Sequence, residues 1–476
     1  MHKLPQIDKT ILYTLPALLA ISLLLLPEES LFFGFTMILI MFVFQVIIYP
    51  KKEIYGYSGL LNLSIPSIVI TTFSIFIAIP SIYVCSTIDS PAIYPYFYSI
   101  VGFYLLFPAG LYFGNKIWFI DKSKVVKIYK SPLQQSKYDF IFADLLWLLI
   151  PIVLGLLFIY VARIDRIPLV ELFLHPGDVA RLSVIRDQSY LVANISVIEK
   201  YLVAWQRSVF IPVSIIVSLF LYVSYKQKKY LIIFVMFLFV GVIYNSLTLE
   251  KSPVAAIFLI LMAFYYLKKQ KLNFKVIIAA IIIIFAIPTI IMAIKFYREE
   301  GLFELLYISI LNRIFLIPSK ALYVHYEMFP QIHDFLWGRS TNLIAWMHPD
   351  GGFPLSNYVA RFWWQDPHAT GTLNAMFLAF FWADFGAIGV IVSSFLVGMA
   401  THWVYYVFLK ISDYQKNIFY VVFSTCMLPA FTFSFFNSNY TILLITRGVI
   451  ITMILLYCIK VFGKMVLSNN NKQTIK

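Results

Sequence analysis

A short segment in the second half of the chain gathers the side chains of an acid–base reaction. It begins at Arg361, passes two tryptophans and reaches Asp366 and His368 before Gly371 and Thr372. A histidine exchanges protons near neutral pH, and a neighbouring carboxylate can hold its tautomer. An arginine offers a planar, charged fork to a phosphate or carboxylate. We therefore predict that Asp366 and His368 supply a general base and that Arg361 stabilises a leaving anion.

The same residues also have structural interpretations. His368 can cap the helix that follows it or face solvent without taking part in chemistry. Trp363 and Trp364 can stack on sugar rings, but tryptophan is also enriched where proteins meet the membrane interface. Both interpretations of the two tryptophans stay open.

Two further groups precede this segment. Arg339 is followed by the hydroxyls of Ser340 and Thr341, and His348 is followed by Asp350. Together with the carboxylate–histidine pair described above, His348 and Asp350 could be taken for metal ligands. Two short pairs in irregular backbone are weak evidence for a coordination sphere. We therefore expect no metal and no cofactor.

The ten arginines are distributed unevenly along the chain. The connectors on one side of the expected membrane hold lysine and no arginine, whereas the arginines fall in the opposite connectors or near their boundaries. Cytoplasmic enrichment of basic residues predicts fewer cations outside, not a change of type. As a set, the arginines suggest an anion site on the outer face. The residues selected for it are Arg181, Arg186, Arg313, Arg339 and Lys251. The alternatives are pairing with outer acids such as Glu171 and, for Lys251, a snorkelling anchor.

Composition places these groups in a membrane protein. Of 476 residues, 61% are hydrophobic and 13% charged, which is far outside the range of soluble proteins. About 20 apolar residues cross a bilayer as one helix. Twelve such runs can be placed: 11–27, 31–49, 65–85, 97–114, 140–162, 209–225, 230–249, 253–267, 276–294, 376–406, 418–436 and 441–462. We therefore expect a single all-α, polytopic membrane domain (1–476) with about 12 transmembrane helices.

Lysine sets the expected orientation. Lysines lie on alternate connectors, so these connectors and both termini are predicted to be cytoplasmic. Two long connectors, 163–208 and 295–375, then lie outside, and the second contains four of the seven histidines. The net charge of +14 follows from this topology and needs no nucleic acid. Asp384, an acid inside a predicted span, points to function, with pairing to Arg447 as the structural alternative.

Three short elements in or directly after the main outer loop resemble a known family. They are Asn312-Arg313 with Leu336-Trp-Gly-Arg-Ser340, an Arg-x9-Gly-Thr element from Arg361 to Thr372, and Asp384-Phe-Gly-x-x-Gly389. With the two long outer loops, they resemble the oligosaccharide repeat-unit polymerases (O-antigen polymerases) and the GT-C-like architecture of polymerases and ligases. The resemblance covers roughly residues 160–400.

This resemblance implies a metal-independent glycosyltransferase of the bacterial inner membrane. Glycan on undecaprenyl pyrophosphate would pass, on the periplasmic or outer face, to a sugar hydroxyl of an incoming lipid-linked repeat unit. The product would be O-antigen or a capsular-type surface polysaccharide. The expected partners are the lipid-linked donor and acceptor, a chain-length regulator and a flippase. A flippase or other transporter is the main alternative, although it should show repeats and a midplane site. An O-antigen ligase shares the architecture.

Overall fold

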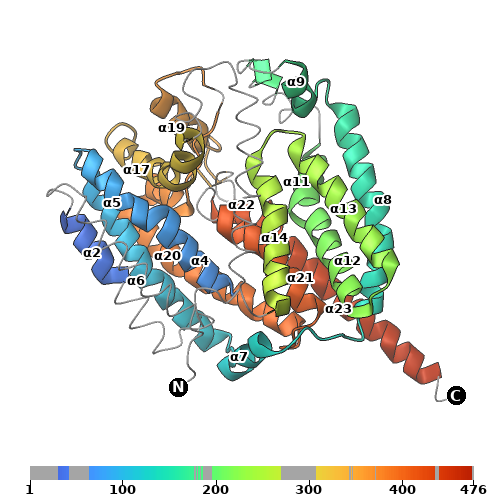
Figure 1. The fold of residues 1–476 in the computed structure, drawn as a ribbon. Helices are drawn as coiled ribbons and strands as arrows, with labels where there is room; N and C mark the ends of the chain where they lie inside the picture. Colours follow the sequence, from blue (N-terminus) through green and yellow to red (C-terminus); the bar gives the residue numbers. More distant parts are fainter. Residues whose placement is uncertain are drawn as a thin grey trace. The chain divides into compact units, whose positions relative to one another are not determined.

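The computed structural model describes residues 31–41, 64–175, 178, 181–182, 184–185, 196–269, 307–341, 345, 347–369, 371–434 and 439–473. Every regular element in these ranges is a helix (Figure 1). With η marking π-helical segments, the elements are α2 (Leu31–Met41), α4 (Ile65–Phe73), η3 (Ser74–Ala78), α5 (Ile79–Thr87), α6 (Ile93–Ile117), α7 (Lys122–Lys130), α8 (Asp139–Arg163), α9 (Pro168–Leu174), α11 (Val197–Trp205), η4 (Gln206–Phe210), α12 (Ile211–Tyr225), α13 (Lys228–Ser246), α14 (Lys251–Lys269), η5 (Tyr307–Leu316), α17 (Ile317–Met328), α19 (Leu355–Trp364), α20 (Phe377–Ile411), α21 (Ile418–Pro429), η6 (Ala430–Ser434), α22 (Tyr440–Ile445) and α23 (Val449–Gln473).

Eight helical stretches in the described residues are long and apolar enough to cross a membrane. They are Ile65–Thr87, Ile93–Ile117, Asp139–Arg163, Ile198–Tyr225, Lys228–Ser246, Ser252–Lys269, Phe377–Ile411 and Tyr440–Ser468. Two shorter apolar helices, Leu31–Ile40 and Ile418–Thr432, coincide with two further predicted spans. The predicted spans 11–27 and 276–294 lie outside the described residues. The predicted all-α character is confirmed for the described residues, and the eight candidate spans are consistent with the predicted multi-pass membrane protein.

One predicted span begins earlier than expected. The run predicted at 209–225 is the end of a helical stretch that starts at Ile198. Ser196 and Glu199 form a capping box: the Glu199 carboxylate accepts from the Ser196 N–H at 2.8 Å, and the Ser196 hydroxyl accepts from the Glu199 N–H at 3.3 Å. A capping box satisfies free donors at a helix N-terminus. The helix therefore starts inside the connector that the apolar pattern assigns to the outside.

The chain divides into two compact units, each considered by itself. Unit 1 comprises residues 1–126, 311–406 and 431–443, and unit 2 comprises 127–310, 407–430 and 444–476.

In unit 1, α6 and α20 cross at two glycines and lie side by side (Figure 1). A methyl group at Gly110 would overlap the carbonyl oxygen of Phe395, and one at Gly398 would overlap that of Phe107. Small residues allow such close backbone approach between membrane helices. Beside this crossing, α17 packs on α6, and the Ser319 hydroxyl lies 2.5 Å from the hydroxyl of Tyr96.

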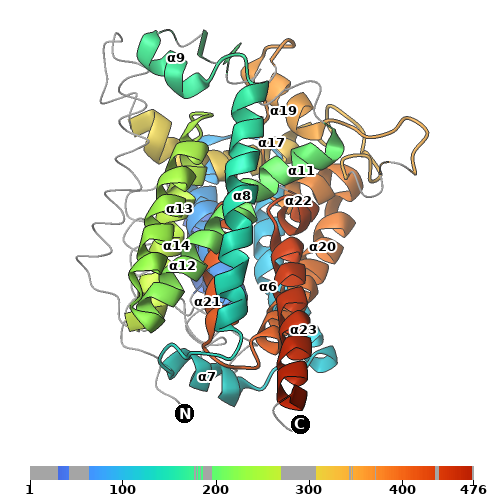
Figure 2. The ribbon, with the colours of Figure 1, turned by 90° about the vertical axis from the view of Figure 1, so that its right-hand side faces the viewer.

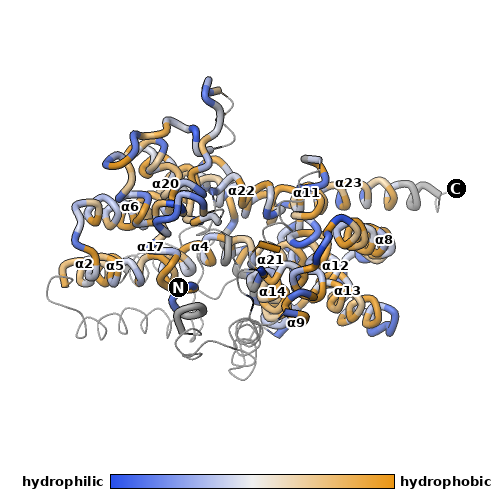
Figure 3. Tube along the Cα trace, turned by 90° about the horizontal axis from the view of Figure 1, so that it is seen from above, coloured by the Kyte–Doolittle hydropathy of each residue, from blue (hydrophilic) through white to orange (hydrophobic). Residues whose placement is uncertain are grey.

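In unit 2, α12 packs against α8, α13 and α21, and α14 packs against α13 (Figure 1). α23 also contacts α8 (Figure 2), where Gly463 leaves room for the ring of Tyr138. α8 and α13 consist mainly of hydrophobic residues (Figure 3), and they expose Phe158 and Phe239. Burial in a lipid bilayer removes such faces from water.

Candidate functional site

The candidate site includes a buried acid in α20 that binds the loop preceding this helix. Asp384 is fully buried. Its carboxylate accepts from the Ser340 N–H at 3.1 Å and the Ser340 hydroxyl at 2.6 Å. The Thr341 hydroxyl donates to the same carboxylate at 3.3 Å. A buried carboxylate is tolerated when donors satisfy it. Asp384, predicted as a functional pointer or a partner of Arg447, is therefore an anchor for the loop at 338–341.

Backbone contacts complete this anchor. The N–H groups of Leu336 and Trp337 donate to the carbonyls of Ala383 and Asp384, both at 2.9 Å. Gly386 interrupts the helical dihedrals of α20 with φ 59° and ψ −143°, a region that favours glycine. Two sequence motifs more than 40 residues apart, Leu336–Ser340 and Asp384–Gly389, are thus bonded to each other.

Arg339 connects the anchored loop to the turn at 348–353. Its guanidinium pairs with Asp350 at 3.4 Å and donates to the carbonyl of Gly351 at 3.4 Å. Its own carbonyl accepts from the Phe353 N–H at 2.8 Å, and the guanidinium lies over the ring of Phe353. Arg339 therefore holds the turn that contains His348, which is half-buried.

The segment from Arg361 to His368 forms a turn at the end of α19. The residue after the helix, Gln365, has a left-handed φ of 53°, and the Asp366 N–H donates to the Arg361 carbonyl at 3.1 Å. The Asp366 carboxylate accepts from the backbone N–H of His368 at 2.9 Å. The sequence predicts an Asp366–imidazole contact, and the contact in the structure is to the backbone. The imidazole of His368 is exposed.

Gly371 closes the turn against α19. A side chain at Gly371 would meet the Trp364 ring, because an ideal Cβ lies 2.5 Å from the Cη2 atom. The Asn357 amide donates to the Gly371 carbonyl at 3.1 Å, and the Leu373 N–H donates to the Ser356 carbonyl at 2.9 Å. The Arg-x9-Gly spacing therefore has a packing reason. Trp364 remains 48% exposed, so part of its ring is open to a ligand.

Arg361 has no carboxylate partner among the described residues. Its printed side-chain hydrogen bond runs from Nε to the Ala369 carbonyl at 3.4 Å. This bond orients the guanidinium at the wall of an open groove of about 400 Å³. The groove is lined by Met328, Ile332, Tyr358, Arg361, Phe362, Gln365 and Pro367. The arrangement offers a positioned cation to an anion.

An acid that was not selected from the sequence is the chain neighbour of the groove residue Met328. Glu327 precedes Met328 at the end of α17 and is half-buried. Burial raises the pKa of its carboxyl above the ordinary value, which moves an acid toward use as a proton acceptor near neutral pH. The sequence of α17 gives no signal for this residue, because a single Glu in a helix is usually interpreted as part of a solvent-facing surface.

In unit 2, the sequence-selected arginine Arg181 is paired. It donates to the Glu171 carboxylate at 2.9 Å, and His175 lies 3.7 Å from the same acid. Arg163 pairs with Glu199 at 3.3 Å. The alternative of pairing with outer acids, including Glu171, therefore describes Arg181.

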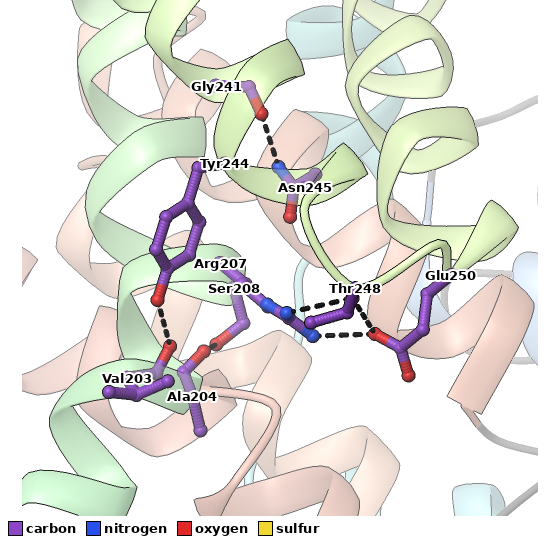
Figure 4. A network of polar contacts seen from close by, with 9 residues as sticks. All are labelled: Val203, Ala204, Arg207, Ser208, Gly241, Tyr244, Asn245, Thr248 and Glu250. Carbon is purple, nitrogen blue, oxygen red and sulfur yellow. Dashed lines mark hydrogen bonds and ion pairs between the residues drawn. The ribbon is translucent and has the colours of Figure 1, made fainter. Parts of the chain in front are cut away.

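Arg207, which was not selected, also pairs with an acid in unit 2 (Figure 4), and its side chain is less exposed than those of Arg181 and Arg163. It donates to the Glu250 carboxylate at 2.5 Å and to the Thr248 hydroxyl at 3.1 Å. The guanidinium carbon lies 5.7 Å from the ring centre of Tyr244, close enough for a cation–π interaction. The Tyr244 hydroxyl in turn points to the Val203 carbonyl. This network joins η4 to the α13–α14 turn.

Arg186, Arg313 and Lys251 are the other basic residues selected from the sequence. Arg186 is outside the described residues. Arg313 is exposed on η5, and Lys251 is the first residue of α14. Comparison with protein-family models, with curated protein sequences and with solved structures gives no match.

Proposed function

We propose that the chain polymerises undecaprenyl-pyrophosphate-linked oligosaccharide repeat units on the outer face of the bacterial plasma membrane. One observation carries the proposal. The elements that resemble the polymerases, Leu336–Ser340 and Asp384–Gly389, are hydrogen-bonded to each other, and Arg339 links them toward α19, where the Arg-x9-Gly element closes on itself. Elements with a shared function are expected to meet in space although they are separated in sequence.

The proposed reaction assigns one step to each group. The bond between the anomeric carbon of the donor glycan and its pyrophosphate oxygen breaks, and the acceptor hydroxyl oxygen bonds to that carbon. The hydroxyl proton passes to the exposed imidazole of His368. Arg361 holds the charge of the departing pyrophosphate. Asp366 fixes the turn through the His368 N–H, so that base and cation stay at one end of α19.

The test is His368→Ala and Asp366→Asn in cells scored for the length of the surface glycan ladder. Removing a general base should slow turnover by roughly 10²–10⁴-fold, which leaves single repeat units in place of a ladder. Asp334→Asn, an exposed acid in the same loop, serves as the matched control and should give wild-type ladders at equal expression. Wild-type ladders from both site variants would remove His368 and Asp366 from the reaction.

The same cells separate the alternatives. A chain that transports lipid-linked units would, when inactivated, leave no repeat unit on the outer face. A ligase would leave full-length polymer on undecaprenyl pyrophosphate. Only loss of a polymerase leaves transported, ligated single units, so either other pattern contradicts the proposal.

A further inference from the structure

We infer that the groove beside α19 binds a sugar ring of the lipid-linked glycan, which would be the acceptor unit. The inference rests on the proposed function and deepens it, since it names the part of the substrate that this surface takes. The groove measures about 400 Å³, within the usual range for sites that hold small ligands. All of its lining residues belong to unit 1.

The groove has an aromatic wall that is already fixed. The ring of Tyr358 meets Phe353 edge-on at 5.1 Å between centres and His333 at 5.5 Å. The neighbouring groove residue Phe362 is 37% exposed. The C–H face of a pyranose is apolar and packs on aromatic surfaces, and a wall held by its neighbours loses little side-chain freedom on binding.

The groove also has polar groups at the end of the helix. Arg361 is oriented by its bond to Ala369, and Gln365 follows in a left-handed conformation. A guanidinium donates to hydroxyl oxygens, and an amide both donates and accepts. Sugar hydroxyls require both roles. The groove therefore offers an apolar surface and a mixed polar edge next to each other.

This combination favours a sugar over two simpler ligands. A polyprenyl chain would use Met328 and Ile332 but would gain nothing from Gln365 and Arg361, which are exposed and would keep their bonds to water. A free phosphate would use Arg361 but not the aromatic wall. A sugar ring uses both surfaces, and the turn of 365–368 places it beside the exposed His368.

The experiment measures saturation transfer by nuclear magnetic resonance from the purified full-length protein in detergent. The probes are methyl glycosides of glucose, galactose, rhamnose and N-acetylglucosamine, with farnesyl phosphate as the lipid probe and inorganic phosphate as the anion probe. We expect transfer to at least one glycoside. Tyr358→Ala and Gln365→Ala should each weaken it by about tenfold. Met347→Ala, which removes an exposed apolar side chain outside the groove, should leave it unchanged.

Each other result overturns the inference. Transfer to farnesyl phosphate alone, lost in Tyr358→Ala, makes the groove a prenyl slot. Phosphate binding that depends on Arg361 without glycoside binding makes it an anion site. Absence of transfer to every glycoside, or glycoside binding that survives both groove variants, removes the groove as a sugar site. Ladder length in the same variants keeps the two proposals apart. If the wild type makes normal ladders but binds no glycoside in the groove, only the inference is contradicted. If the groove binds a glycoside but cells that lack the protein still make normal ladders, only the proposed function is contradicted.

Discussion

Arg361 of unit 1 differs from the paired arginines of unit 2 in what it contacts. In unit 2, Arg207, Arg181 and Arg163 each meet a carboxylate, at 2.5, 2.9 and 3.3 Å. In unit 1, Arg339 also meets a carboxylate, that of Asp350 at 3.4 Å, whereas Arg361 is tied to a backbone carbonyl and, among the described residues, meets no acid. The same residue type on predicted outer segments therefore has two roles. A carboxylate partner uses the charge to join helices, and a carbonyl partner orients the fork while its charge stays available to a ligand.

The largest effect that sharpens this comparison is expected at Arg361. Arg361→Lys keeps the charge but loses the planar fork, and lysine substitutes poorly where two oxygens must be held together. Loss of a charge-stabilising donor should lower the polymerisation rate by about 10²–10³-fold, with normal expression and thermal stability. The measurements are ladder length and a melting curve on the purified protein. Full ladders from Arg361→Lys would place this arginine with the structural ones.

Arg207→Lys is the matched variant, and its effect should be on stability. Its side chain is 17% exposed and bonded to both Glu250 and Thr248, so the substitution should lower the free energy of unfolding by about 1 kcal/mol. Polymerisation per folded molecule should not change. A loss of turnover without a loss of stability would contradict the distinction between the structural Arg207 and the ligand-binding Arg361.

The next effect concerns Asp384, an acid that is held by hydroxyls and N–H groups and not by an arginine. Asp384→Ala leaves the Ser340 and Thr341 donors without their acceptor, at a cost of about 2–3 kcal/mol. The loop at 336–341 should detach, which lowers both thermal stability and polymer yield. Buried Cys85 and Cys426 report unfolding through a thiol-reactive dye. Ser340→Ala, which retains two donors to the carboxylate, should be milder. Equal melting curves for wild type and Asp384→Ala would contradict the anchor.

A smaller effect is expected at Gly371. Gly371→Ala should push Trp364 from its seat, because the added methyl would lie 2.5 Å from the ring. The resulting shift of the Arg361 turn should lower polymerisation by about tenfold. Combining it with Trp364→Ala should remove the clash, so the double variant should do no worse than Trp364→Ala alone. Additive losses would show that the two residues act separately.

The smallest effect at neutral pH concerns His325, whose charge is suppressed by burial and not balanced by an acid as in the arginine pairs. His325, outside the candidate spans, is fully buried with Nδ1 2.7 Å from the Ala321 carbonyl, and burial lowers its pKa to about 4. The unfolded chain, with a pKa near 6.5, then binds more protons between pH 6.5 and 4. The free energy of unfolding should therefore decrease as the pH is lowered from 6.5 to 4, by up to about 1.4 kcal/mol per pH unit. Thermal melts of His325→Leu should lose this part of the slope, and an unchanged slope would assign it to other groups.

Sequence and structure agree where the signal is local. Long apolar runs locate the described spans because a bilayer requires them. The Ser-x-x-Glu capping box at Ser196 and Glu199 is also a local signal, but the span predicted at 209–225 did not use it and began too late. The pairing of Arg181 with Glu171 was only one of the alternatives open in the sequence, and the anchor between Ser340 and Asp384 was not predicted. They join residues 10 and 44 positions apart, and such contacts depend on how helices and loops pack. The role of Gly371 depends in the same way on where the Trp364 ring lies.

The crossing of α6 and α20 has a consequence for how the proposed lipid-linked substrate would reach the protein. At Gly110 and Gly398 the two backbones approach so closely that not even one methyl group fits between them. An isoprene unit carries a methyl branch and is wider than this space. The seam between α6 and α20 is therefore closed to a polyprenyl tail at this depth, and lateral entry from the bilayer must use another pair of helices. Gly110→Leu would force the seam apart at the expense of folding and would not create a gate.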